Sequence, residues 1–228
     1  MSEQIASSIA HFFQTKNFTT SYKPIVFLAF IHAIRNHTRP PTADPLLIPT
    51  DAIAFYFLKF NYTLFKRFRL KQINQMAKRV DIYNIIEQYF GDSPKKKLTH
   101  KDMDPRIGNE VKTLLNRHVI LLLRKDMPIY DFYNAQENLI PLKVEVKDEQ
   151  EFRSLINPAQ IAFLGVKPEV EDYIRHHYPI LEKAALGVCT EFLETFNTVP
   201  KLYSKLLVAA DSFHALRNIP DKIGRAHV

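Results

Sequence analysis

Apolar residues in the first third of the chain recur every three to four positions, which is the spacing of one face of an α-helix. Ile5, Ile9 and Phe12 form one such stripe, and the segments 21–37 and 51–68 continue the pattern with aliphatic and aromatic residues. We therefore expect a helix in each of these three segments.

The boundaries of these helices carry their own signals. Ser21 is suited to cap the second helix, and Pro24 lies in its first turn, where a missing N–H costs no hydrogen bond. Thr50 or Asp51 is expected to cap the third helix. The intervening stretch RPPTADPLLIPTD has four prolines. Because each proline removes a backbone donor and restrains the residue before it, this stretch is predicted to be a loop.

Helical periodicity continues through the middle of the chain. Segment 69–90 predicts one or two helices that end at Gly91, and a further helix is expected near residues 105–116. The intervening loop is polar and contains the run Lys95-Lys96-Lys97. We expect those three lysines to be exposed and mobile.

The period of the pattern then changes. Segments 118–126, 128–134 and 139–146 are short, rich in β-branched and aromatic residues and partly alternating, so they predict two or three strands. From Asp148 onward the helical period returns. The expected fold is mainly α with a small β insert (α+β), divided into a basic-faced helical region 1–116, a β insert 117–147 and a C-terminal helical region 148–222.

Composition narrows the class of protein. With 228 residues, of which 46% are hydrophobic, the chain can bury a sizeable core. Its one cysteine, Cys189, excludes an internal disulfide framework and a zinc site built from paired cysteines. The N-terminus does not resemble a secretory leader, and no window reaches the roughly 18 apolar residues of a membrane span. A cytoplasmic protein without a membrane partner is expected.

Positive charge is concentrated in one part of the sequence. The net charge is +7, but residues 59–125 hold 16 of the 31 Lys and Arg against 6 of the 24 Asp and Glu, a local balance of +10. Such a concentration is typical of a face that binds nucleic-acid phosphates, although a solvated helix face is the alternative. The residues predicted to contact the phosphates of double-stranded DNA are Lys66, Arg67, Arg69, Lys71, Lys78 and Arg79.

The aromatic residues beside these cations admit two interpretations. They could stack on exposed bases or form the apolar face of a helix. We expect most of them to be core residues. They are Phe55, Tyr56, Phe57, Phe60, Tyr62, Phe65 and Phe68.

Three stretches together resemble bacterial HNH endonuclease-domain proteins that carry a helical region ahead of the nuclease. Ser21-Tyr22-Lys23-Pro24 resembles the opening of that region, and IPTDAIAFYFLKFNYTLFKRF followed by KQINQ is similar to its aromatic helix and next turn. Segment 163–206 contains the match to a Phe-Leu-Glu-x-Phe-Asn pattern, at residues 192–197. The resemblance spans about residues 20 to 217, and it depends on the order and spacing of the stretches.

The resemblance implies a role in DNA cleavage without the catalytic part. In that family the nuclease module follows the helical region and supplies a histidine that activates water, a second histidine or asparagine that binds a divalent metal, and often zinc-binding cysteine pairs. This chain has no such set after residue 217 except His227. The implied function is the DNA-engaging or regulatory region of an HNH endonuclease of the restriction or defence type, with no catalytic residue, metal site or cofactor of its own.

The last six residues, IGRAHV at 223–228, match the translation of a widely used short-read sequencing adapter. Read as ATC GGA AGA GCA CAC GTC, the adapter continues into the stop codon TGA. We expect these residues to be an assembly artefact and the native gene to continue past about Lys222. The divalent metal of the HNH chemistry is expected in that missing module.

Two other functions remain open. The chain could bind a partner protein without nucleic acid, and it could form a homo-oligomer. It could also be a Mg²⁺-dependent nuclease that uses Asp131, Glu145 and Lys147, since an Asp followed by Glu-x-Lys on adjacent strands can hold a metal and position water.

Two further groups of potential ligands favour structural roles. His176 and His177 are adjacent, so on a helix they point about 100° apart, and we expect them to mark a helix end before Tyr178-Pro179. Asp102 and Asp104 lack a third carboxylate at calcium-loop spacing and are expected to be solvated loop charges.

Overall fold

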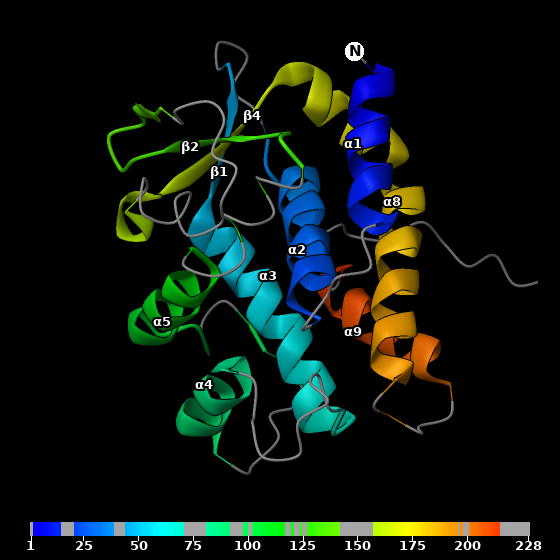
Figure 1. The fold of residues 1–228 in the computed structure, drawn as a ribbon. Coiled ribbons are helices and arrows are strands. Elements are labelled where there is room, and N and C mark those ends of the chain that lie inside the picture. Colours follow the sequence, from blue (N-terminus) through cyan, green and yellow to red (C-terminus); the bar gives the residue numbers. More distant parts are fainter. Residues whose placement is uncertain are drawn as a thin grey trace, which may run out of the picture.

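A computed structural model describes most of the chain, with gaps at several connections. The described residues are 2–14, 21–38, 44–70, 81–91, 98–99, 102–116, 120, 124, 127–141, 157–195, 197 and 201–214. A small sheet lies at one end, and helices extend away from it (Figure 1). The predicted α+β class is confirmed.

The α-helices are α1 (Ser2–Gln14), α2 (Tyr22–Asn36), α3 (Thr50–Tyr62), α4 (Asp81–Phe90), α5 (Pro105–Leu115), α8 (Pro168–Glu194) and α9 (Leu202–His214). A π-helical turn, η1 (Thr63–Arg67), continues α3, and a 3-10 turn, η4 (Pro158–Gln160), precedes the last strand. The strands are β1 (Leu46–Pro49), β2 (Asp131–Tyr133), β3 (Leu139–Ile140) and β4 (Phe163–Val166). Among the helices described, none is long and apolar enough to cross a membrane.

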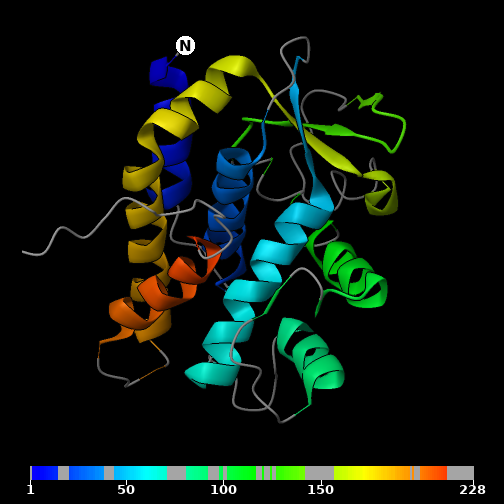
Figure 2. The same cartoon turned by 180° about the vertical axis from the view of Figure 1, so that it is seen from behind.

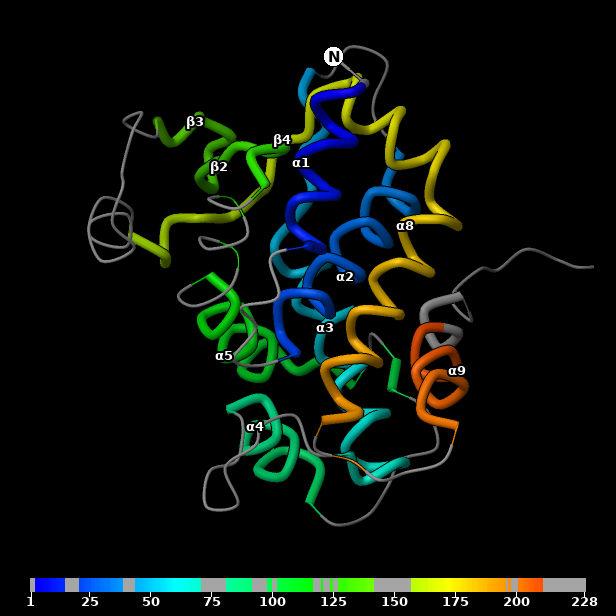
Figure 3. Tube along the Cα trace, turned by 45° about the vertical axis from the view of Figure 1, so that its right-hand side comes forward, coloured from blue at the N-terminus to red at the C-terminus, as the bar shows by residue number. Residues whose placement is uncertain are grey.

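Helix α2 is the centre of the core. It packs against α3 and α8, and α1 packs against α8 (Figure 3). Residues all round α2 are buried, including Phe27, Phe30 and Ile31 at 0% exposure. A helix that is apolar on every side is stable only when neighbours cover it, which explains why α2 and α3 lie inside the molecule.

The sheet has the order β1-β4-β2-β3, and its strand pairs are antiparallel. Among the strands of the described residues, β2 and β3 lie in the predicted insert, whereas β1 and β4 lie outside it. The loop predicted for the proline-rich stretch is wrong at β1, and the helix predicted after Asp148 is wrong at β4. β1 forms because the side chains of Leu46 and Ile48 are buried in the core and its backbone pairs with β4. Pro45 precedes the strand and Pro49 is its last residue, and prolines are tolerated there because β1 is an edge strand.

Two strands, β2 and β3, form within the range for which two or three were predicted, and segment 118–126 is not a third strand at its described residues. Ile120 and Arg124 are helical. Ile120 is fully buried, and its carbonyl accepts a hydrogen bond from the Tyr130 hydroxyl at 2.8 Å. A short apolar run of this length cannot be distinguished from a buried helical segment by its periodicity alone.

The helix end predicted at His176-His177 is also wrong, because α8 continues through Pro179 to Glu194. The proline cannot donate to the Arg175 carbonyl, so the helix bends instead of stopping (Figure 2). Tyr178 and Leu181, on either side of the proline, are both buried. The free energy gained by burying these side chains offsets the loss of one backbone hydrogen bond, so the helix continues.

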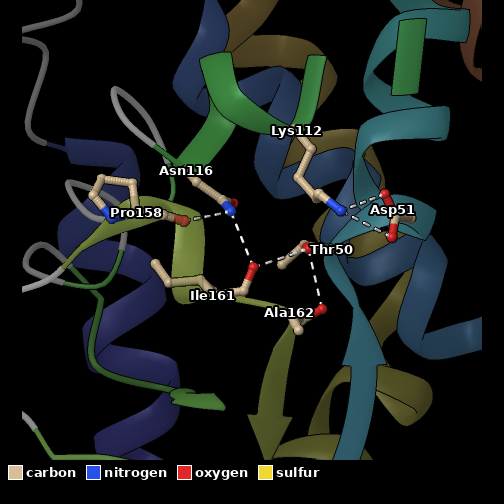
Figure 4. A network of polar contacts seen from close by, with 7 residues as sticks. All are labelled: Thr50, Asp51, Lys112, Asn116, Pro158, Ile161 and Ala162. Atoms are coloured by element: carbon tan, nitrogen blue, oxygen red, sulfur yellow. Dashed lines mark hydrogen bonds and ion pairs between the residues drawn. The ribbon is translucent and has the colours of Figure 1, made fainter. Parts of the chain in front are cut away.

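A junction of polar side chains joins the start of α3 to the end of α5 and the segment before β4 (Figure 4). Thr50 is the first residue of α3, and it does not cap the helix as expected. Its hydroxyl donates to the carbonyls of Ile161 and Ala162 at 3.4 and 3.1 Å. The Asn116 amide donates to the carbonyls of Pro158 and Ile161 at 3.0 and 3.1 Å. At Thr50 a non-local contact therefore takes the place of the expected local cap.

Gly165 is expected to be essential at the centre of the sheet. A Cβ there would lie 2.2 Å from Cε2 of Tyr133 and 3.0 Å from Cγ of Pro45. We expect Gly165→Ala to lower the free energy of unfolding by about 1–3 kcal/mol, as overpacking does. Urea unfolding of the purified variant measures this loss.

The matched control is Gly187→Ala in α8, where a Cβ would meet nothing within 4 Å. This change is expected to stabilise the protein by about 0.5–1 kcal/mol, because glycine loses more backbone entropy in a helix than alanine. A Gly165→Ala protein as stable as the wild type would contradict the close approach of β2 to β4.

Candidate nucleic-acid interface

Residues 63–70, which lie within the basic part of the sequence, are called the basic corner here. It comprises η1 and the three residues that follow, at the end of α3, which packs beside α4 (Figure 1). Arg67 and Arg69 are exposed, whereas Lys66 is only 4% exposed. Two of the three cations in the corner are therefore exposed to solvent, and the third is buried.

Backbone hydrogen bonds close the end of the helix at this corner. The amides of Phe68, Arg69 and Leu70 donate to the carbonyls of Thr63, Phe65 and Leu64 at 3.1–3.3 Å. Arg69 has a φ of 54°, in the left-handed region that only glycine adopts without strain. Helix ends commonly use this conformation to satisfy their last carbonyls. Here an arginine occupies a position at which glycine would be the easier choice.

The two exposed arginines lie over aromatic rings. The Cζ atom of Arg67 is 5.3 Å from the centroid of Phe68, and that of Arg69 is 5.9 Å from the centroid of Phe65. Cation–π contact of this kind restrains a guanidinium without using its N–H donors. Within the part of the chain that the structure describes, neither arginine has an acidic partner.

Lys66 differs from the prediction, because its ammonium faces the protein. Its Nζ donates to the carbonyl of Gly91, the residue directly after α4, and lies 5.2 Å from the Phe65 centroid. A π-helical turn follows α3, so the direction of residue 66 could not be read from a 3.6-residue period. Lys71, Lys78 and Arg79, the other predicted phosphate contacts, lie outside the described residues, as do Lys95, Lys96 and Lys97.

The aromatic side chains of α3 mainly form core, as expected. Phe55, Tyr56, Phe57, Phe60 and Tyr62 are buried. Phe65 and Phe68 are half-buried and pack against the same core. Only these two aromatic residues of the predicted set therefore border the exposed cations.

The alternative nuclease site is only partly described. Asp131 lies in β2, and its Oδ1 forms an ion pair with Nη2 of Arg124 at 3.0 Å. This cation already neutralises the carboxylate that a metal would need. Glu145 and Lys147 lie outside the described residues. Within the described ranges, no group of three or more His, Cys, Asp or Glu side chains could hold a metal ion.

Asp102 and Asp104 act in local structure. The carboxylate of Asp102 accepts from the amide and hydroxyl of Thr99 at 2.9 and 2.8 Å. Asp104 caps α5 by accepting from the amide of Arg106 at 2.7 Å, and its hydrogen bonds with Arg106 lower the pKa of that carboxyl. The two aspartates order the start of α5.

A buried polar cluster between α2 and α8 was not predicted from the sequence. Nδ1 of His32 lies 2.9 Å from the Tyr178 hydroxyl, which donates to Oε1 of Glu182 at 2.7 Å. The Arg35 guanidinium lies 4.3 Å from the centroid of the Tyr178 ring. The residues come from positions 146 apart, so no local pattern reveals their meeting. Their mutual contacts hold the bent part of α8 against α2.

A second contact, partly buried, lies close to this cluster. Nε of Arg175 pairs with Oε1 of Glu171 at 2.8 Å, and its other nitrogens donate to the carbonyls of Arg35 and His37. Arg175 thus satisfies carbonyls at the end of α2, where a cation is favoured by the helix dipole. Both groups of contacts hold α2 and α8 together.

Comparison with known proteins gave no relatives: no protein-family model, curated protein or solved structure matches this chain.

Proposed function

We propose that this chain is the DNA-engaging or regulatory region of an HNH-type endonuclease of the restriction or defence type, and that the basic corner contacts the phosphates of double-stranded DNA. The observation that carries the proposal is the pair Arg67 and Arg69, exposed, supported by aromatic rings and without acidic partners among the described residues. Guanidinium groups recognise phosphate through paired N–H donors.

The arrangement of the resembling stretches supports the proposal. Those stretches form α2, then α3 with η1, and then β4 with α8. Helix α2 packs against both α3 and α8, so all three belong to one core. The basic corner comprises the last residues of the aromatic helix in the second stretch, up to Phe68, and the two residues that follow. In this proposal the hydrolytic step and its divalent metal belong to a nuclease module beyond this chain, and the described residues only bind and orient DNA.

Replacement of both corner arginines tests the proposal. For the variant Arg67→Ala/Arg69→Ala, the slope of log K against log[salt] for a 20-base-pair duplex is expected to become shallower by ~1.8, since each lost phosphate contact removes ~0.9. Fluorescence anisotropy at several salt concentrations measures the slope.

The matched control removes the same charge elsewhere. Arg106 and Lys112 are paired with Asp104 and Asp51, so Arg106→Ala/Lys112→Ala is expected to leave the slope nearly unchanged. Equal slopes for the corner variant and the wild type would show that the corner does not contact phosphate. A wild-type protein with no duplex binding at low salt would instead favour the protein-interaction module.

A further inference from the structure

We propose that Lys66 and Tyr83 are positioning residues for phosphate contact: they fix the basic corner to α4 so that Arg67 and Arg69 are presented together. This inference rests on the proposed function of the corner. It assigns Lys66 a role different from direct contact with phosphate.

Lys66 provides the first attachment. Its side chain is buried, and its ammonium donates to the carbonyl of Gly91 at the end of α4. A cation is favoured at this place, because the carbonyl end of a helix carries partial negative charge. The residues on either side of Lys66 in the turn contribute aromatic surface and the exposed Arg67. Fixing residue 66 therefore also fixes the direction of its neighbour.

Tyr83 provides the second attachment. Its hydroxyl donates to the carbonyl of Leu70 at 2.9 Å, and its ring stacks on Phe65 with centroids 4.2 Å apart. Leu70 and Phe65 lie on either side of the exposed arginines in the sequence. Tyr83 is itself buried in the first turn of α4. The corner is thus held at both of its ends by one helix.

Helix α4 is in turn fixed to the core. The amide of Ile82 donates to the Tyr22 hydroxyl at 3.0 Å, and the ring of Phe90 contacts Tyr62 with centroids 5.2 Å apart. The chain of contacts runs from the corner through α4 to α2 and α3. This support matters because Arg69 has a left-handed backbone conformation, which is strained for a residue other than glycine. Without these contacts the backbone would change to a less strained conformation.

Arginines that are held in place before DNA binds should give a higher affinity than arginines that become ordered on binding. Lys66→Met and Tyr83→Phe each remove one attachment, so DNA affinity is expected to fall about tenfold for the first and severalfold for the second. The salt slope should stay the same, because the bound state still contacts as many phosphates. In the Arg67→Ala/Arg69→Ala background, neither change should reduce affinity further, since a positioning residue has nothing left to position.

The experiment measures affinity for a 20-base-pair duplex and its salt slope for both single variants in both backgrounds, at matched concentrations of folded protein. Tyr89→Phe is the control, because the Tyr89 hydroxyl on the same helix donates to Glu110 in α5 and not to the corner. Its affinity should equal that of the wild type. If Lys66→Met does not fold, Tyr83→Phe decides the question, since it removes one hydroxyl and retains the ring.

Three results would overturn the inference. A slope that falls by ~0.9 in Lys66→Met, or a further loss in the arginine-free background, would make Lys66 a direct phosphate contact. Unchanged affinity for both Lys66→Met and Tyr83→Phe would make the two residues structural only. If the Arg67→Ala/Arg69→Ala variant binds DNA like the wild type, the proposed function fails and this inference fails with it. The first two results would overturn the inference alone, so the two kinds of failure can be distinguished.

Discussion

The folded protein is expected to lose stability steeply as the pH rises above about 9. Burial raises the pKa of the Cys189 thiol and of the Tyr22, Tyr83 and Tyr178 hydroxyls, from ordinary values of 9.0 for the thiol and 10.0 for the phenols. The unfolded chain releases these protons at lower pH than the native state does. Stability is therefore complete below the unfolded values and decreases as the pH rises toward the raised native values.

The expected loss is large because several groups act together. Each group contributes up to about 1.4 kcal/mol per pH unit in the range between its two pKa values. Urea unfolding at a series of pH values from 8 to 11 gives the slope directly. Cys189 titrates first in the unfolded state, so Cys189→Ala should make the slope between pH 9 and 10 shallower by up to one proton. Stability that stays level up to pH 11 would contradict the burial of these groups.

Asn116→Asp is expected to cost about 3–5 kcal/mol of unfolding free energy, as does a buried charge without a partner. Asn116 is 2% exposed, and its amide faces the carbonyls of Pro158 and Ile161 (Figure 4). A carboxylate there would put negative charge against two acceptors. The expected fall in the melting temperature is about 6–20 °C for a chain of this size, measured by calorimetry.

The same junction provides a control for this prediction. Lys112 and Asp51 form an ion pair at 3.1 Å, with side chains 28% and 61% exposed. Lys112→Ala should cost less than about 1 kcal/mol, because exposed pairs contribute little. Similar losses for the two variants would show that Asn116 is not the residue that joins α5 to the segment before β4.

Local sequence signals correctly predicted the end of α4 and the position of α5. Gly91 marks the end of α4 and has a φ of 52°, as a helix-ending glycine should. The helix expected near 105–116 is α5, which begins at Pro105 after the capping Asp104. In these places the physical cause lies within a few residues of its effect. The aromatic residues of α3 are also buried, as expected of the core of a helical protein.

The predictions failed where distant segments determine the conformation. β1 and β4 each have a weak strand pattern and exist because they pair with each other. Thr50 donates to carbonyls more than a hundred positions away instead of capping its own helix. Lys66 carries the charge that a phosphate contact requires, but the π-helical turn and the carbonyl of Gly91 decide where that charge points. Only tertiary structure distinguishes it from its neighbours Arg67 and Arg69.

The order of strands in the sheet has a consequence for synthesis of the protein. β1 pairs with β4, whose residues lie about 120 positions later. At ordinary translation rates of about 5–20 residues per second, the edge of β1 waits roughly 6–24 s for its neighbour. Unpaired strand edges attract other chains during such an interval. The edge of β1 in a nascent chain is therefore open to pairing with other chains until Val166 has left the ribosome.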